Sequence, residues 1–191
     1  MGNMKIPVLG DIQDAHKRIE SYIHRTPVME SSQINSMFGT SLFFKCENFQ
    51  KVGAFKFRGA TNAVLSLSEE ERSKGVITHS SGNHAAALSL AAKKRGAAAH
   101  IVMPHTAPDI KKNAVMGYGG EIIYCEPTLE ARETTLVKVV EKTGAIFVHG
   151  YDNYKIIEGQ ATCAKEILED VEDLDYITVP CGGGGLTSGT A

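Results

Sequence analysis

The chain has 191 residues, of which 42% are hydrophobic and 22% charged, a composition ordinary for one or two globular domains. Twenty basic residues against 22 acidic ones give a formal charge of −2, which excludes a general electrostatic attraction to nucleic acid or to an anionic membrane. The four cysteines show no C-x-x-C spacing, and neither an N-x-[ST] acceptor nor a transmembrane run occurs, so we expect a reduced, cytoplasmic protein.

The first predicted element is a helix over 11–24, because apolar residues such as Ile19 and Ile23 recur there on one helical face. Asp11 is its predicted N-cap, and Thr26-Pro27 is the predicted stop.

Strands and helices then alternate in a regular way. The predicted strands are 42–46, 75–79, 97–103, 121–125 and 145–149, and the predicted helices are 84–95, 109–116 and 129–143. This alternation predicts a parallel sheet that helices cover on both faces.

The last predicted elements are a helix from Asn153 to about Asp170, a strand over 176–180, a glycine loop and the start of a helix. A domain that ended there would leave apolar surface and backbone groups unpaired. We therefore expect the chain to be an N-terminal fragment of a longer protein.

Lys56 is the candidate for covalent attachment of an aldehyde cofactor. It stands between Phe55 and Phe57 at the start of a predicted helix. Partial burial beside the cations Lys51 and Arg58 would lower the pKa of its amine, and the neutral amine is the form that attacks aldehydes. The alternative interpretation is an ordinary solvated lysine.

Two loops offer binding chemistry. The stretch 78–84 supplies hydroxyls, an amide and imidazoles at the end of a predicted parallel strand, where open α/β sheets bind ligands and where exposed N–H groups suit a carboxylate. The glycines of 182–185 allow backbone N–H groups to converge on a phosphate. The alternatives are an N-capping turn that uses Ser80 or Asn83, and a short flexible turn. Neither H-E-x-x-H, a Cys/His cluster nor G-x-S-x-G occurs, so we expect no metal site in this chain and no serine hydrolase.

In this order and spacing, N-F-Q-K-V-G-A-F-K-F-R-G-A, S-S-G-N-H and the tetraglycine loop resemble the fold type II pyridoxal-phosphate enzymes of the serine/threonine dehydratase family. The similarity runs from about residue 8 to residue 191. It implies an α/β, tryptophan synthase β-like fold with two open parallel-sheet domains. Residues 1–75 and 153–191 would form segments of a large domain, the second incomplete, and residues 76–152 a small domain that closes over the cofactor.

The resemblance also implies roles for single residues. Lys56 would carry the pyridoxal phosphate, Phe55 would lie against its ring, and Asn83 would bond its phenolic oxygen. The phosphate would be held by Gly182, Gly183, Gly184 and Gly185. The substrate carboxylate would be held by Ser80, Ser81, Asn83 and His84, with Arg132 as a further contact.

The implied activity is racemisation of L-serine to D-serine, with Lys56 and the Ser81 hydroxyl exchanging the Cα proton on opposite faces. Loss of water from serine to give pyruvate and ammonia would be a side activity. Tyr151 stands where serine-racemising members often have asparagine, which keeps a serine/threonine ammonia-lyase as an alternative. A third possibility is a truncated product without catalysis.

Further expectations concern regulation and assembly in the full-length protein. Ser31, Ser32, Lys51 and Tyr118 match a nucleotide effector site at a dimer interface, whereas Val52 and Ala86 depart from it. The resemblance therefore implies ATP and Mg2+ as activators and a homodimer, with the carboxylates for the divalent ion beyond residue 191.

Overall fold

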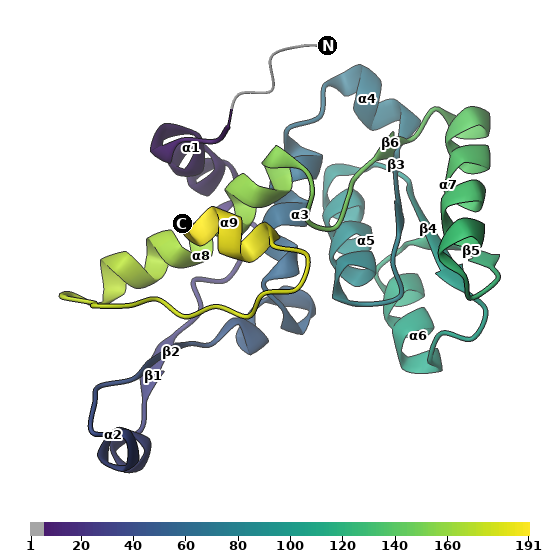
Figure 1. Ribbon diagram of the computed structural model, residues 1–191. Helices are drawn as coiled ribbons and strands as arrows, with labels where there is room; N and C mark the ends of the chain where they lie inside the picture. Colours follow the sequence, from purple (N-terminus) through teal and green to yellow (C-terminus); the bar gives the residue numbers. More distant parts are fainter. Residues whose placement is uncertain (1–5) are drawn as a thin grey trace.

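The computed structural model describes residues 6–191 and shows a parallel sheet beside a group of helices drawn from both ends of the chain (Figure 1). Within this part of the chain the sheet has the strand order β5-β4-β3-β6, and every neighbouring pair is parallel, as the sequence predicts. The strands are β3 (Val76–His79), β4 (Ala99–Pro104), β5 (Glu121–Cys125) and β6 (Ile146–Phe147). The connecting helices are α5 (Asn83–Arg95), α6 (Asp109–Gly117) and α7 (Leu129–Thr143).

Helices cover both faces of this sheet because successive strand residues point in opposite directions. Val76 and Ile101 pack with Leu88 of α5 in the larger core. Their neighbours Ile77 and Val102 face the other way and pack with the α7 side of the molecule. Figure 1 shows α5 and α7 on opposite sides of β3 and β4, which confirms the predicted covered parallel sheet.

The helical group is built around α3 (Lys56–Leu65), which packs against α5 and against α8 (Tyr154–Asp170). Helices α1 (Leu9–Ile19) and α9 (Gly185–Thr190) pack on α8. A Cβ built on Gly159 of α8 would lie 2.6 Å from the Cα of Gly59 in α3, so the two helices cross with their backbones in contact. Glycine is required on both sides of this crossing.

A buried ionic cluster also joins α3 to α8. Arg58 is 0% exposed and donates to Glu166 at 2.7 Å and to Glu47 at 2.8 Å. Lys45 bonds the second oxygen of Glu166 at 2.8 Å. Burial alone would raise the pKa of Glu166, but its hydrogen bonds with Arg58 and Lys45 outweigh burial and hold that pKa below its ordinary value.

The N-terminal helix differs from its prediction at both ends. It begins at Leu9, and Asp11 lies inside its first turn, where the carboxylate accepts a hydrogen bond from the N–H of the N-cap residue Val8 at 2.9 Å. The helix ends at Ile19, well before the predicted stop at Thr26-Pro27. The main-chain N–H of His24 donates instead to the side chain of Gln50, at 2.9 Å.

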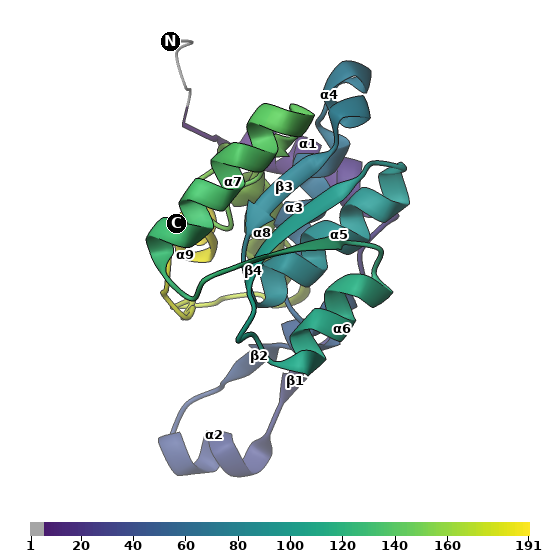
Figure 2. The same ribbon diagram turned by 90° about the vertical axis from the view of Figure 1, so that its right-hand side faces the viewer.

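Several short elements were not predicted. Strand β1 (Val28–Glu30) pairs antiparallel with the expected strand β2 (Phe43–Lys45), and α2 (Ser32–Phe38) caps the projecting arm between them (Figure 2). The short helices η1 (Glu47–Phe49), η2 (Lys51–Gly53) and α4 (Glu69–Lys74) complete the chain.

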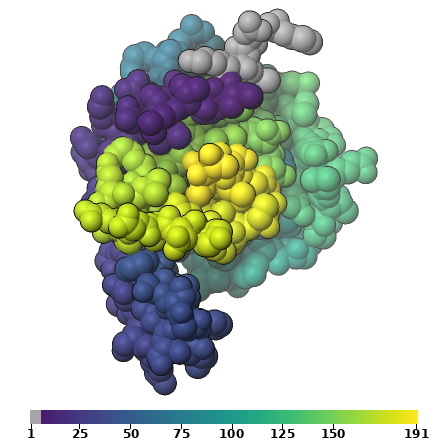
Figure 3. Space-filling model, turned by 60° about the vertical axis from the view of Figure 1, so that its left-hand side comes forward, coloured from purple at the N-terminus to yellow at the C-terminus, as the bar shows by residue number. Residues whose placement is uncertain are grey.

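The predicted strand over 176–180 is not formed. The segment is extended but joins no sheet, and it follows the side of α8 (Figure 3). A strand needs a neighbour for its ladder hydrogen bonds, and none of the described residues provides one here. Residues 6–191 contain no helix long and apolar enough to cross a membrane.

Candidate functional site

Lys56 is the first residue of α3, and its amine is half-buried. The Nζ atom donates to the backbone oxygen of Gly150 at 2.7 Å and lies 5.3 Å from the centroid of the Phe55 ring. Burial lowers the pKa of this amine, as the sequence predicts, and no carboxylate of the described residues is bonded to it.

Two details of the predicted surroundings of Lys56 are wrong. Phe57 is 0% exposed in the core, so the lysine lies against one aromatic ring rather than between two. Arg58 points away into its cluster with Glu47 and Glu166 and does not lower the pKa of Lys56. The cause of the shift is burial alone.

The loop from Ser80 to Gly82 joins β3 to α5 at the carboxyl edge of the sheet. The main-chain N–H of Ser80 donates to Val102 at 3.1 Å, and the Ser80 hydroxyl accepts from the N–H of Gly82 at 3.3 Å. Ser81 is half-buried, and Asn83 is exposed with its amide oxygen 3.4 Å from the amine of Lys111. The loop therefore presents polar side chains where a helix begins, and the first N–H groups of a helix have no partner within it.

His84 lies beneath this loop rather than in it. It is 5% exposed, and its Nε2 is 3.1 Å from the backbone oxygen of Val148. Burial lowers the pKa of the imidazole to about 4, so the ring is neutral at pH 7. The other ring nitrogen, Nδ1, is buried without a hydrogen-bond partner among the described residues.

The glycine loop, Gly182 to Gly185, faces Tyr151. A Cβ on Gly183 would overlap the Tyr151 ring, and one on Gly185 would lie 3.0 Å from the Tyr151 Cβ. In contrast, a Cβ on Gly182 would meet nothing within 4 Å, and Gly184 has a φ of +86°, which favours glycine. Close packing thus explains the glycines at 183 and 185, whereas the backbone at Gly182 is open for a ligand.

Segment 148–151 connects all of these groups. Val148 contacts His84, Gly150 accepts from Lys56, and Tyr151 covers Gly183. His149 holds the turn, because its Nδ1 accepts from the N–H of Asp152 at 2.8 Å. Sequence reasoning singled out only Tyr151 in this segment. The predicted strand 145–149 includes Val148 and His149, but β6 ends at Phe147, and the residues after it form this loop at the edge of the sheet where ligands bind.

Other predicted residues lie away from Lys56. Arg132 is a half-buried residue of α7, close enough to His79 to lower the pKa of that imidazole, after the larger effect of burial and a contribution from His149. No hydrogen bond or ion pair within residues 6–191 joins the four predicted effector residues. Ser31 caps α2, Ser32 is exposed beside it, Lys51 donates to the backbone of Tyr22, and Tyr118 ends α6.

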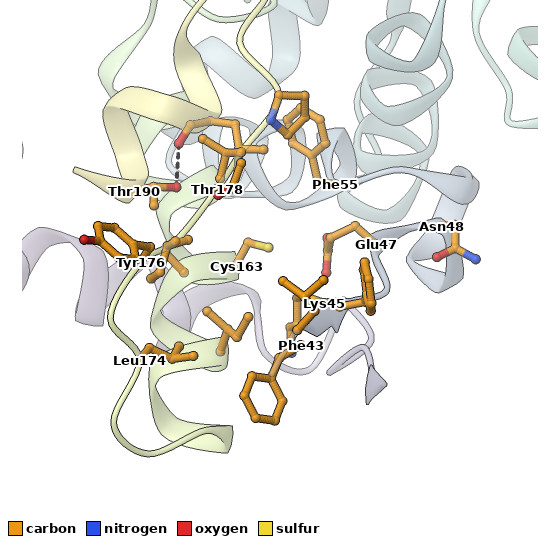
Figure 4. A pocket seen from close by; sticks show the side chains of 18 of the residues that line it. Phe43, Lys45, Glu47, Asn48, Phe55, Cys163, Leu174, Tyr176, Thr178 and Thr190 are labelled. Atoms are coloured by element: carbon orange, nitrogen blue, oxygen red, sulfur yellow. Dashed lines mark hydrogen bonds between the residues drawn. The ribbon is translucent and has the colours of Figure 1, made fainter. Parts of the chain in front are cut away.

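A pocket of about 600 Å3 lies between β2, α8 and the extended segment (Figure 4). Phe43, Cys163 and Tyr176 line it, and Lys56 does not. Burial raises the pKa of the Cys163 thiol to about 12, so this cysteine is not a nucleophile at neutral pH. The pocket is a mainly apolar groove that borders the lysine site, because Phe55 lines it as well. The described residues also contain no group of three or more side chains suited to a metal ion.

Comparisons with known proteins agree with this geometry. The family model described as "Pyridoxal-phosphate dependent enzyme" matches residues 19–191. Serine racemase of Dictyostelium discoideum is 53% identical over 190 residues, which is 100% of this chain and 59% of that protein. The β-hydroxyaspartate dehydratase of Paracoccus denitrificans is 54% identical over 187 residues, 98% of this chain and 59% of that protein.

The structure of maize serine racemase superposes with a TM-score of 0.96 at 51% identity, covering 98% of this chain and 57% of that one. The chain therefore spans less than two thirds of the length of these relatives.

Proposed function

The chain belongs to the pyridoxal-phosphate-dependent enzyme family, and on this basis we propose that it serves the racemisation of L-serine to D-serine, with β-elimination of serine to pyruvate and ammonia as a side activity. The observation that carries the proposal is the half-buried Lys56 amine, which burial favours in its neutral form. This amine bonds to the segment 148–151, which also contacts His84 at the start of α5 and Gly183 of the glycine loop.

The residues present fit pyridoxal phosphate. Lys56 provides an amine whose pKa is lowered by burial, and the Phe55 ring lies close to it. The open backbone at Gly182 can receive a phosphate. Asn83 is exposed at the start of α5, where its amide can reach a ligand. When bound, the cofactor supplies an electron sink that makes the Cα proton of an amino acid removable.

Loop 80–83 holds the substrate carboxylate in this proposal. The hydroxyls of Ser80 and Ser81 and the unpaired N–H groups at the start of α5 are suited to an anion. Lys56 then exchanges the Cα proton on one face, and the Ser81 hydroxyl does so on the other. Arg132, across the sheet on α7, has a supporting role.

The second candidate function is an ammonia-lyase that racemises little. Tyr151 at the glycine loop and the 54% identity to a β-hydroxyaspartate dehydratase support it. A chiral assay for D-serine, run beside a pyruvate assay and with 3-hydroxyaspartate as a further substrate, separates the two functions. D-serine formation favours the racemase, and pyruvate or oxaloacetate without D-serine favours the lyase.

Ser81→Ala tests the two-base assignment. We expect D-serine formation to fall by about 100-fold or more, as for loss of an acid–base group, while pyruvate formation persists. Equal loss of both activities would contradict the role of Ser81. If the wild-type chain binds the cofactor yet turns over no substrate, the third interpretation, a chain without catalysis of its own, is favoured.

Activation by ATP and Mg2+, a homodimer and a cytoplasmic location remain part of the proposal for the longer protein. The support is the match of Ser31, Ser32, Lys51 and Tyr118 to a nucleotide site. We expect millimolar Mg-ATP to raise turnover, and an unchanged rate would remove the nucleotide from the proposal.

A further inference from the structure

The position of the Lys56 amine depends on a segment outside any strand or helix. Its hydrogen-bond acceptor is the backbone oxygen of Gly150, at 2.7 Å. Strand β6 ends at Phe147, and beyond it one backbone hydrogen bond, from Val148 to Ile77 at 2.9 Å, ties the segment to β3. Whatever else holds Val148 and Gly150 in place therefore also decides where the lysine amine lies.

His84 contacts both residues. Its Nε2 is 3.1 Å from the oxygen of Val148, and since a carbonyl oxygen only accepts hydrogen bonds, Nε2 carries the proton. The ring also lies beside Gly150, because a Cβ built on Gly150 would be 3.5 Å from the Cδ2 and Cγ atoms of His84. The imidazole is 5% exposed, so water does not compete for this contact.

The electrostatics keep this ring a neutral donor. Apart from burial, the titratable groups that act on His84 are all basic: Lys56, His149 and His79. Each of them disfavours a positive charge on the imidazole. A neutral buried ring does not attract a substrate carboxylate by charge, so the side chain is better suited to holding protein than to holding substrate.

We propose that His84 is a positioning residue for Lys56: by donating to Val148, two residues before Gly150, it fixes the segment whose carbonyl oxygen receives the lysine amine. The inference rests on the proposed function only in taking Lys56 as the reactive group. Since His84 directly follows Asn83, one turn of α5 places both the carboxylate-binding loop and the lysine.

The test measures the titration of Lys56 in the chain without cofactor. Acetic anhydride at a series of pH values labels neutral amines, and peptide mass spectrometry reports the label on Lys56 alone. His84→Gln retains an N–H in place of Nε2, whereas His84→Met retains the volume without the donor. Leu136→Ala, in the separate core beneath α7, is the matched destabilised control.

We expect the same Lys56 pH midpoint in wild type, His84→Gln and Leu136→Ala. In His84→Met the midpoint should rise by about 0.5, roughly a threefold smaller neutral fraction at fixed pH, because the loosened segment lets water reach the amine. An unchanged midpoint in His84→Met would overturn the proposal, as would an equal rise in Leu136→Ala.

If His84→Met does not fold, His84→Asn replaces it, because asparagine is too short to reach Val148. A second measurement needs no variant: nitrogen-15 NMR of the wild-type chain should show His84 protonated at Nε2 and not at Nδ1. The opposite tautomer would overturn the proposal. Neither readout involves the cofactor, so failure here is distinguishable from failure of cofactor attachment at Lys56.

Discussion

The two loops beside Lys56 each begin a helix, but they are supported differently. Ser80–Gly82 follows β3, a buried strand with a parallel partner on each side. The loop Gly182–Gly184 follows an extended segment that pairs with no strand among residues 6–191, and it is held by contact with Tyr151 and by the packing of α9 on α8. The first loop is therefore fixed by a sheet and a core, and the second by a few contacts.

The largest expected effect is at the ionic cluster that joins α3 to α8. Arg58→Met leaves Glu47 and Glu166 without their buried partner and should lower the free energy of unfolding by about 3–5 kcal/mol. Urea denaturation measures this change in the free energy of unfolding. Arg25→Met, which removes surface ion pairs with Glu169 and Asp170, should cost less than about 1 kcal/mol. Similar costs for both would mean that the cluster does not anchor the two helices.

A matched pair of isoleucines sharpens the comparison between the two supports. Ile77 in β3 is 0% exposed, and Ile177 in the extended segment is half-buried. Ile77→Ala should cost about 2–5 kcal/mol in unfolding free energy, and Ile177→Ala about 1 kcal/mol or less. Equal losses in thermal or urea unfolding would show that the extended segment is core structure in solution.

Acid should weaken the support of the first loop. The folded-state pKa of His84 is about 4, and the unfolded value is near 6.5. Between these values the unfolded chain binds more protons, so stability falls as the pH drops from about 6.5 to 4, by roughly 2–3 kcal/mol for this residue.

Protonation of paired carboxylates such as Glu166 also destabilises the fold at low pH. The informative quantity is therefore the difference in acid-induced loss of unfolding free energy between wild type and a His84 variant. Urea unfolding at pH 7 and pH 4.5 should show a smaller acid loss in His84→Gln than in wild type. Identical losses would argue against a buried neutral histidine.

The smallest expected effect concerns the second loop. Gly183→Ala should destabilise the fold by overlap with Tyr151, and Tyr151→Ala should remove most of that penalty. The double-mutant cycle should give a coupling of about 1–2 kcal/mol. Gly82→Ala, whose Cβ meets nothing within 4 Å, is the control. Additive effects of the 183 and 151 changes would place Tyr151 away from the loop.

The sequence predicts secondary structure correctly where the signal, a hydrophobic pattern, lies within the element itself. The strands and helices from β3 to β6 are confirmed because their hydrophobic patterns are contained within each element, although β6 covers only Ile146–Phe147 of the predicted strand 145–149. The capping box of Ser68 and Glu71 would also have predicted α4. The segment 176–180 has an equally strand-like pattern, but pairing depends on a neighbour and not on local sequence.

Within the site, the burial of Lys56 and the lowered pKa of its amine were predicted correctly, but the predicted contribution of the neighbouring cations was wrong. Arg58 is close to Lys56 in sequence, but its side chain faces α8. Its partner there, Glu166, lies 108 residues away in the chain, so local sequence does not reveal the contact. The roles of Gly150 and His84 depend on the same kind of long-range packing, which no local pattern specifies.

The central claim is that Lys56 is the residue that binds pyridoxal phosphate. The most direct measurement incubates the chain with the cofactor, reduces it with borohydride and locates the added mass by peptide mass spectrometry. We predict one labelled peptide, with the label on Lys56, and no label in Lys56→Ala. A label on another lysine, or equal labelling of the Lys56→Ala variant, would contradict the account.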